Sequence, residues 1–213
     1  MTTLDPNPED LEILLKAFSN YSDKPLSNEA LQVIERVGMQ GLHKNGTTFL
    51  MLAAGCNHFD NIHFLLDKGV SVVEADWRGS TALHHAFNDE PIADCVQILI
   101  DAGACLEARD VSEMTPLIYG LYRAAEPEQD ADALMALIES GADLDATIGA
   151  EGLEEWFELG KSAREIILDP SYGYPERLVD CVRRVVALRS QTDLKDKLLS
   201  VENSKSKPLM RVM

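Results

Sequence analysis

Two adjacent histidines, His84 and His85, raise the first question of chemistry in this sequence. They follow a threonine in the stretch "GSTALHHAF", residues 79–87. Paired imidazoles could bind a metal ion or transfer protons. If the stretch is helical, however, neighbouring side chains point about 100° apart, so the two rings cannot easily share one metal. The pair alone therefore does not predict an active site or a metal site.

Other fragments of chemical motifs are incomplete. The stretch "GKS" at 160–162 matches the end of a phosphate-binding loop, but Glu155 stands where that motif needs glycine. His58 and His63 are five residues apart and do not share a helical face well. No serine stands in a nucleophile elbow, and no cysteine lies near a recognisable histidine–asparagine set. The sequence therefore predicts no catalytic residue, no cofactor and no enzymatic activity.

Four oxygen-bearing residues have the spacing of ligands in a calcium-binding loop. They are Asp143, Asp145, Thr147 and Glu154. The turn of such a loop needs glycine at its sixth position, which holds Ile148 here. Two of the four also belong to "GADLDA", an ending that other parts of the chain share, so we expect no metal site.

The elements that must position these side chains repeat along the chain. "GTTFLMLAA" at 46–54 aligns with "GSTALHHAF", which places Thr81 33 residues after Thr48, and Thr115 follows Thr81 by 34 residues. Each unit continues with apolar residues at helical spacing and then a glycine, which is typical of a helix end. The three apolar triplets are Ile62, Leu65 and Leu66; Val96, Leu99 and Ile100; and Leu134, Leu137 and Ile138.

This pattern resembles the ankyrin repeat, whose motif is Gly-x-Thr-Pro-Leu-His-x-Ala followed by a second helix and a β-turn finger. "STALHHA", "TPLIYG", "HFLLDKGV", "QILIDAGA" and "ALIESGAD" all fit. The resemblance implies that Thr48, Thr81, His84 and Thr115 are structural, with threonine and histidine hydrogen-bonding between turns and repeats. Glu113 and Gly120 depart from it, standing where the family has glycine and alanine.

The resemblance implies an all-α ankyrin-repeat solenoid of stacked helix pairs, with short β-turn fingers and an N-terminal capping helix pair. The predicted divisions are a cap at 1–42; repeats at 43–76, 77–110 and 111–148, the last with an inter-helix insertion; an insertion helix plus a degenerate terminal repeat at 149–190; and a partly disordered tail at 191–213. The insertion is assigned to "AAEPEQD" at 124–130, the extra helix to 151–159 and the last helix to 175–188.

The N-terminal helix pair has its own start and stripe. Asn7 and Pro8 form a helix start, with acidic residues next to the positive end of the helix dipole. Leu11, Leu14, Leu15 and Phe18 form one apolar stripe. A second helix is predicted at 27–37.

The formal net charge is −17, and residues 1–150 carry all of the excess, with 25 acidic against 8 basic residues. Such a field repels nucleic acid and anionic membranes and favours a basic protein partner, although simple solubility explains it as well. The four cysteines show no zinc-ligand spacing and are predicted to be small buried residues in a reducing compartment. With no signal peptide or membrane-spanning run apparent, we predict a cytoplasmic location and no membrane partner.

The ankyrin resemblance also implies where a partner binds, namely on a concave face built from finger tips and the ends of first helices. The predicted protein-binding residues are Asp76, Trp77, Arg78, Ser80, Asp89, Arg109, Val111, Glu113, Met114, Tyr122 and Arg123. Trp77 is the strongest of them, because large aromatic residues and arginines dominate interface energetics. An alternative surface is the acidic run Glu126, Glu128, Asp130 and Asp132, whose simpler interpretation is a solvated loop.

The sequence thus predicts a non-catalytic protein-binding module with no small-molecule substrate. Within that class we favour a stoichiometric inhibitor or neutralising partner of a basic protein, of the antitoxin or immunity type. The alternative is an adaptor or secreted effector that binds a host or signalling protein. An enzyme of unrecognised type is the third class.

Overall fold

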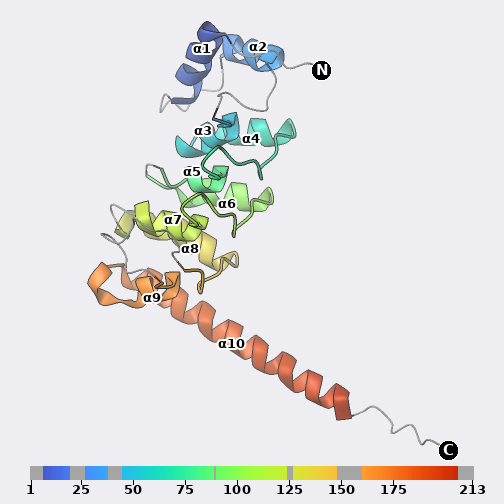
Figure 1. Cartoon of the computed structure of the whole chain (residues 1–213), viewed down its shortest axis with the longest axis vertical. Helices are drawn as coiled ribbons and strands as arrows, with labels where there is room; N and C mark the ends of the chain where they lie inside the picture. The colour runs from blue at the N-terminus through green and yellow to red at the C-terminus, as the bar shows by residue number, and fades with distance from the viewer. Residues whose placement is uncertain are drawn as a thin grey trace, which may run out of the picture.

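The chain forms an elongated stack of helix pairs that follow one another in chain order (Figure 1). The structure, a computed structural model, describes residues 7–19, 27–37, 45–88, 90–123, 127–147 and 160–205. These ranges contain no β-strand, only isolated bridges between Ala75 and Thr81 and between Thr147 and Ser162. The predicted all-α solenoid is confirmed.

The helices lie in two layers. They are α1 (Pro8–Ser19), α2 (Asn28–Val37), α3 (Phe49–Gly55), α4 (Phe59–Asp67), α5 (Ala82–His85), α6 (Ala93–Asp101), α7 (Pro116–Arg123), α8 (Pro127–Glu139), α9 (Ala163–Leu168) and α10 (Glu176–Lys205), with a 3-10 helix, η1 (Pro170–Tyr172), before α10. The first helices α3, α5, α7 and α9 contact one another in sequence, and the second helices α4, α6, α8 and α10 do the same. Each pair therefore stacks on its neighbours.

The core lies between these layers and runs through the stack without interruption. Leu65 of α4 and Leu99 of α6 occupy equivalent positions in successive pairs, and both are fully buried. Leu83 of the first helix α5 is fully buried as well. Because no single pair can bury its apolar faces alone, stability depends on contacts between neighbouring pairs.

Side-chain caps fix where the first helices begin. Thr48 Oγ1 accepts from the Met51 amide at 3.2 Å, and Ser162 Oγ accepts from the Glu165 amide at 3.3 Å. The Glu165 carboxylate accepts in return from the Ser162 amide at 2.8 Å, which forms a capping box. Ser162 thus does for α9 what threonine does in the earlier pairs.

Gly120 is explained by its neighbours in the stack. A Cβ atom at this position would lie 2.8 Å from Phe87 Cδ1 and 2.9 Å from Leu134 Cδ2. Phe87 comes from the preceding pair and is fully buried. Glycine therefore replaces the alanine of the repeat motif because the large phenylalanine ring occupies the space of the missing methyl group.

The N-terminal helix pair covers α3. Asn7 Oδ1 accepts from the Asp10 amide at 2.8 Å, and Asp10 accepts in return from the Asn7 amide, so the predicted capping asparagine is confirmed. Asp10 also pairs with Arg36 of α2, which joins the two helices. Leu14 is fully buried, while the other three side chains of the predicted stripe lie outside the described side chains.

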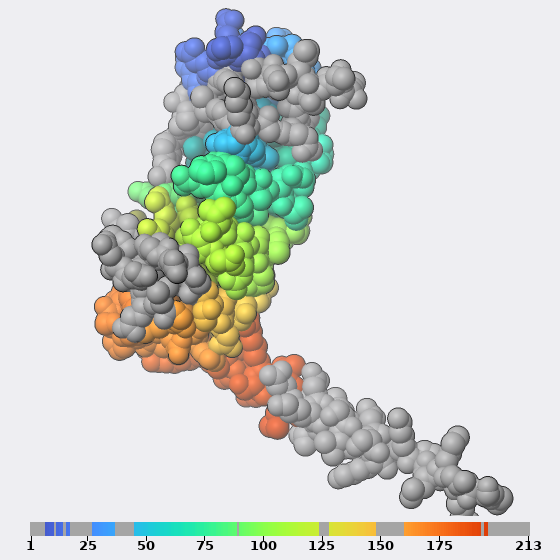
Figure 2. All heavy atoms as spheres, viewed as in Figure 1, coloured from blue at the N-terminus to red at the C-terminus, as the bar shows by residue number. Residues whose placement is uncertain are grey.

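Three segments differ from the sequence prediction or lie outside the described residues. Helix α10 does not stop at residue 188 but continues to Lys205 and leaves the stack (Figure 1), and the space-filling view shows its first part at the end of the stack (Figure 2). Helix α8 begins at Pro127, so residues 127–130 of the expected insertion are helical. The helix expected at 151–159 lies outside the described residues.

The cysteines do not share one environment. Cys95 and Cys181 are buried, but Cys56 is half-buried and Cys105 is exposed, and none of the four forms a disulfide with a described residue. The prediction that all are buried is therefore wrong for Cys105, which follows the end of α6 and faces solvent. Among the described residues, no helix is long and apolar enough to cross a membrane.

Candidate protein-binding surface

Each finger is shaped by a buried aspartate. Asp76 Oδ1 accepts from the amides of Arg78 and Ser80 at 2.9 and 3.0 Å. Asp110 does the same in the next finger, where its Oδ1 accepts from the Ser112 and Met114 amides, each at 2.9 Å. These bonds hold the chain in a tight turn and project the residue after each aspartate outward.

Neighbouring fingers are joined through their backbones. The Trp77 amide donates to the Asn45 carbonyl at 2.8 Å, and the Val111 amide donates to the Arg78 carbonyl at 2.6 Å. Gly79 has φ 74°, and a Cβ there would lie 3.0 Å from the Arg109 carbonyl oxygen, so this turn requires glycine. The fingers consequently form one row rather than independent loops.

His84 lies at the centre of the stack and joins two pairs. Its Nδ1 accepts from the Thr81 amide at 3.1 Å, and its Nε2 donates to the Met114 carbonyl at 3.1 Å. The carbonyl can only accept, which fixes the proton on Nε2. Burial lowers the pKa of His84, so the neutral ring is favoured.

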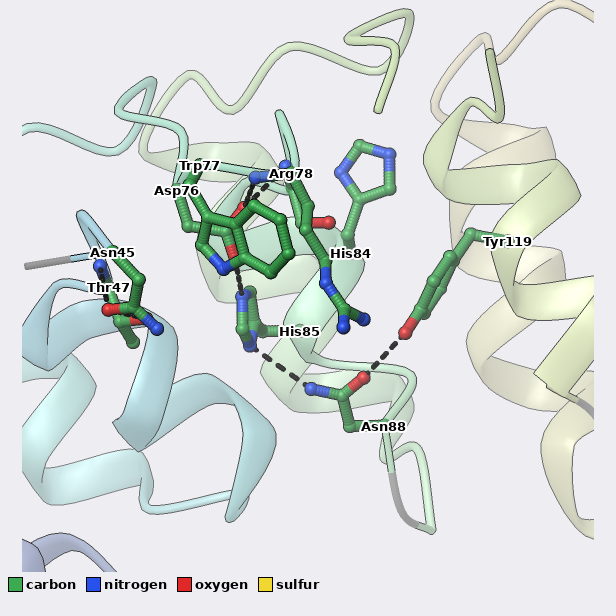
Figure 3. Close-up of a pocket in the computed structure, with 10 residues that line it drawn as sticks. Asn45, Thr47, Asp76, Trp77, Arg78, His84, His85, Asn88 and Tyr119 are labelled. Carbon is green, nitrogen blue, oxygen red and sulfur yellow. Dashed lines mark hydrogen bonds and ion pairs between the residues drawn. The ribbon is translucent and has the colours of Figure 1, made fainter. Parts of the chain in front are cut away.

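His85, which falls on an unspecified position of the repeat motif, is also held by hydrogen bonds. Its Nε2 lies 3.1 Å from Asp76 Oδ2, and its Nδ1 lies 3.1 Å from the side-chain nitrogen Nδ2 of Asn88. The Tyr119 hydroxyl donates to Asn88 Oδ1 at 2.7 Å. The four side chains thus form one hydrogen-bonded row that crosses from one repeat unit to the next (Figure 3).

This row lines a cavity of about 330 Å³ on the finger side of the stack (Figure 3). The lining residues are Asn45, Thr47, Asp76, Trp77, Arg78, Ser80, His84, His85, Asn88 and Tyr119. Three successive units contribute to it, so the cavity exists only in the stacked array. The sequence prediction missed Tyr119, although the repeat register makes it the equivalent of His85, 34 residues later.

The outer edge of the cavity carries the largest exposed aromatic side chain of the described residues. Trp77 is 63% exposed, and the Arg78 guanidinium lies 4.9 Å from the centre of its ring. Val111, the next finger's equivalent residue, is 67% exposed. An exposed tryptophan beside an apolar residue and an arginine is typical of a protein interface.

A family model described as ankyrin repeats, in three copies, matches residues 14–110. Residues 14–110 are ankyrin repeats. The match begins inside α1, so it includes the helix pair that the sequence analysis assigned to a cap. It ends before α7, yet the pairs α7–α8 and α9–α10 continue the same stack. Ankyrin repeats are protein–protein interaction modules and are generally non-catalytic.

Burial removes three residues from the predicted binding surface of the ankyrin array. Ser80 and Met114 are 7% and 4% exposed, and the Asp76 side chain is 6% exposed. Ser80 and Met114 occupy equivalent positions after the finger turn, where the chain passes beneath the first helix. Asp76 is used entirely in shaping its own finger and holding His85.

The remaining predicted residues divide by exposure. Arg109 and Glu113 are exposed and contact each other, with Arg109 also donating to the Glu113 carbonyl at 2.8 Å. Arg123 is exposed and donates to the Asn88 carbonyl, while Tyr122 is half-buried. Asp89 lies outside the described residues.

The acidic run is not a free patch. Asp130 is buried, and Glu126 lies outside the described residues. Arg177 of α10 lies 2.6 Å from Asp132 Oδ1 and 3.6 Å from Glu128 Oε1. The terminal helix therefore neutralises part of this surface.

The incomplete chemical motifs belong to the scaffold. Asp143 Oδ1 accepts from the Asp145 amide at 2.9 Å, and Asp145 pairs with Arg164 at 2.7 Å. Lys161 pairs with Asp169 at 3.1 Å, next to the Ser162 cap. The part of the chain that the structure describes holds no cluster of three or more metal-ligating residues.

Proposed function

We propose that this ankyrin array binds a protein partner through the concave face formed by its finger row. The observation that carries the proposal is Trp77, 63% exposed at the edge of a cavity built by three repeat units. Because hydrogen bonds hold the fingers and the first helices in place, the array loses little conformational entropy when it binds a partner.

We further propose that the partner has a basic surface. The outer helices α4 and α6 expose Asp60, Asp67, Asp94 and Asp101, and the only basic side chain at their ends is Lys68. This charge raises the rate of encounter with a basic protein. The favoured role is a stoichiometric inhibitor or neutralising partner that covers the active surface of its target. The lack of disulfides among the described residues fits action in the reducing cytoplasm.

An adaptor, including a secreted effector, is the second candidate, and helix α10 favours it. The helix extends away from the stack (Figure 1), with Leu188 and Leu194 57% and 61% exposed. An adaptor needs two separate surfaces, and this helix provides a second one at a distance from Trp77.

The test compares Trp77→Ala with Leu188→Ala, a matched loss of one exposed apolar side chain on α10. The dissociation constant for a purified partner should rise about tenfold or more in Trp77→Ala, since interface tryptophans commonly contribute above about 2 kcal/mol. It should stay unchanged in Leu188→Ala for a partner that docks on the finger row, whereas a loss of affinity in Leu188→Ala alone would assign that partner to the α10 surface. Unchanged affinity in Trp77→Ala would overturn the concave-face proposal.

The partner's own activity separates the two candidate roles. An inhibitor should abolish that activity at a one-to-one ratio, whereas an adaptor should leave it intact. Calorimetry gives the ratio, and an assay of the partner at increasing chain concentration gives the inhibition. Full partner activity in the saturated complex would exclude the inhibitor role.

A further inference from the structure

Arg78 differs from the other described arginines because its guanidinium forms no hydrogen bond or ion pair with any described residue. Each of the others bonds to a carboxylate or a backbone carbonyl; they are Arg36, Arg109, Arg123, Arg164, Arg177, Arg183, Arg184 and Arg189. In a chain with a net charge of −17, carboxylates are abundant. An arginine without one, at the edge of a cavity, therefore points to a ligand.

The nearest carboxylate in sequence cannot neutralise Arg78. Asp76 Oδ1 accepts from two backbone amides, including that of Arg78 itself, and its Oδ2 bonds to His85 Nε2. The Asp76 side chain is only 6% exposed. The finger turn thus fixes the Arg78 backbone through this carboxylate and leaves the guanidinium without a counter-ion.

The free hydrogen-bonding capacity of the cavity consists largely of donors. The guanidinium of Arg78 extends toward the row formed by His85, Asn88 and Tyr119 (Figure 3). Both ring nitrogens of His85 are engaged in that row. The Trp77 indole N–H forms no hydrogen bond with the described residues. A ligand that fits must therefore supply acceptor oxygens.

We propose that this cavity, which we call the Arg78 cavity, binds the carboxylate of an aspartate or glutamate side chain on the docked partner. The inference rests on the proposed function, because the carboxylate belongs to the segment that lies on the finger row. The planar guanidinium can hold both carboxylate oxygens at once, and the Trp77 ring covers the apolar stem of the side chain. A volume of about 330 Å³ admits one such side chain with adjoining backbone.

Charge selects a carboxylate over a phosphate group. A phosphoryl group carries close to two negative charges at neutral pH, twice the charge of a carboxylate. The acidic chain repels it correspondingly more, and one guanidinium neutralises only half of it. The acidic chain attracts a partner that is basic overall, and one acidic side chain on that partner can pair with Arg78 in this cavity.

The direct test uses small probes on the full chain, with NMR detection of the Trp77 indole N–H. The probes are N-acetylglutamate amide, the uncharged N-acetylglutamine amide and inorganic phosphate. We expect saturable shifts with the glutamate probe. The affinity for this probe should be at least about tenfold weaker in Arg78→Gln, because a charged hydrogen bond is lost. Arg164→Gln, at an arginine that already pairs with Asp145 and does not line this cavity, should bind the probe like the wild type.

Several results would overturn the assignment. They are equal binding of the glutamine probe, binding retained in Arg78→Gln, and tighter binding of phosphate than of the glutamate probe. Absence of any saturable shift would do the same. Arg78→Lys should bind with intermediate affinity, because it keeps the charge but loses the two-pronged geometry.

Peptide display on the full chain separates this inference from the proposed function. Peptides that need Trp77 and carry a fixed aspartate or glutamate support both, and Arg78→Gln should weaken them at least about tenfold. Peptides that need Trp77 but have no fixed acidic residue overturn the carboxylate assignment and leave the proposed function standing. The proposed function alone is overturned if the glutamate probe binds the cavity but the selected peptides bind equally well to Trp77→Ala.

Discussion

His84 Nε2 lies 3.1 Å from the carbonyl oxygen of Met114, so a side chain of one repeat is bonded to the backbone of the next finger. The same ring accepts from the Thr81 amide and stands edge-on to Tyr119, with ring centres 5.6 Å apart. One fully buried imidazole thus connects helix α5, the following finger and the cavity wall. The stiffness of the candidate surface depends on this connection.

Replacing His84 with alanine should lower the free energy of unfolding by about 3 kcal/mol, because the buried Thr81 amide would lose its acceptor, the Met114 carbonyl would keep only the Asp110 amide, and a cavity would replace the ring. Urea unfolding followed by circular dichroism measures the change. His63→Ala is the matched control, since His63 is exposed on α4 and should change stability by less than about 0.5 kcal/mol. Equal effects of the two substitutions would contradict the structural role of His84.

Stability should also fall on mild acidification. Burial lowers the pKa of His84 and of His85 in the folded chain below the ordinary value of 6.5. Above pH 6.5 both rings are neutral in both states. As pH falls below 6.5, the two rings take up protons in the unfolded chain but remain neutral in the folded chain. Each ring therefore lowers the free energy of unfolding by up to about 1.4 kcal/mol per pH unit.

Urea unfolding at pH 7.5, 6.0 and 5.0 tests this. The wild type should lose stability across the series, and His84→Gln should lose less, because one of the two buried rings is gone. Because both proteins carry the same carboxylates, the difference between their slopes reports the ring of His84. A slope that is the same in both proteins would argue against the buried neutral imidazole.

The repeat motif predicted the scaffold well because it records local geometry. Threonine before a short helix predicts a structural role at its start, and the Thr48 side chain caps helix α3. Exposure of Trp77 followed from its place at a finger tip. The burial of Ser80 and Met114 did not follow from residue type, because the equivalent residues Thr47, Ser80 and Met114 differ in polarity and yet all three are buried.

The cavity could not be predicted in the same way. Its hydrogen-bonded row joins Asp76, His85, Asn88 and Tyr119, which come from different units and meet only when the units stack. Repeat register places His85 and Tyr119 at equivalent positions but does not say which partners they choose. The lack of a counter-ion for Arg78 depends on the hydrogen bonds of Asp76, and spacing alone does not reveal it.

Gly120→Ala should destabilise the array by about 1–2 kcal/mol, even though alanine is the better helix former by about 1 kcal/mol. The new methyl group would lie 2.8 Å from Phe87 Cδ1, inside a packed core. Thermal unfolding measures the loss. The double variant Phe87→Leu, Gly120→Ala should be more stable than the sum of the single changes predicts, and strict additivity would show that the two sites do not compete for space.

Glu113→Gly should stabilise the array by about 0.5–1 kcal/mol. Glu113 has φ 57°, a left-handed conformation that costs a residue with a side chain about 1–2 kcal/mol, while glycine loses about 0.5–1 kcal/mol of backbone entropy instead. The carboxylate contributes little, since it is exposed and lies 3.8 Å from the exposed Arg109. Glu113→Gln separates the two effects, because it removes the charge and keeps the backbone cost. Urea midpoints should therefore rise only in the glycine variant, and an equal rise in both would mean that charge, rather than backbone conformation, limits this turn.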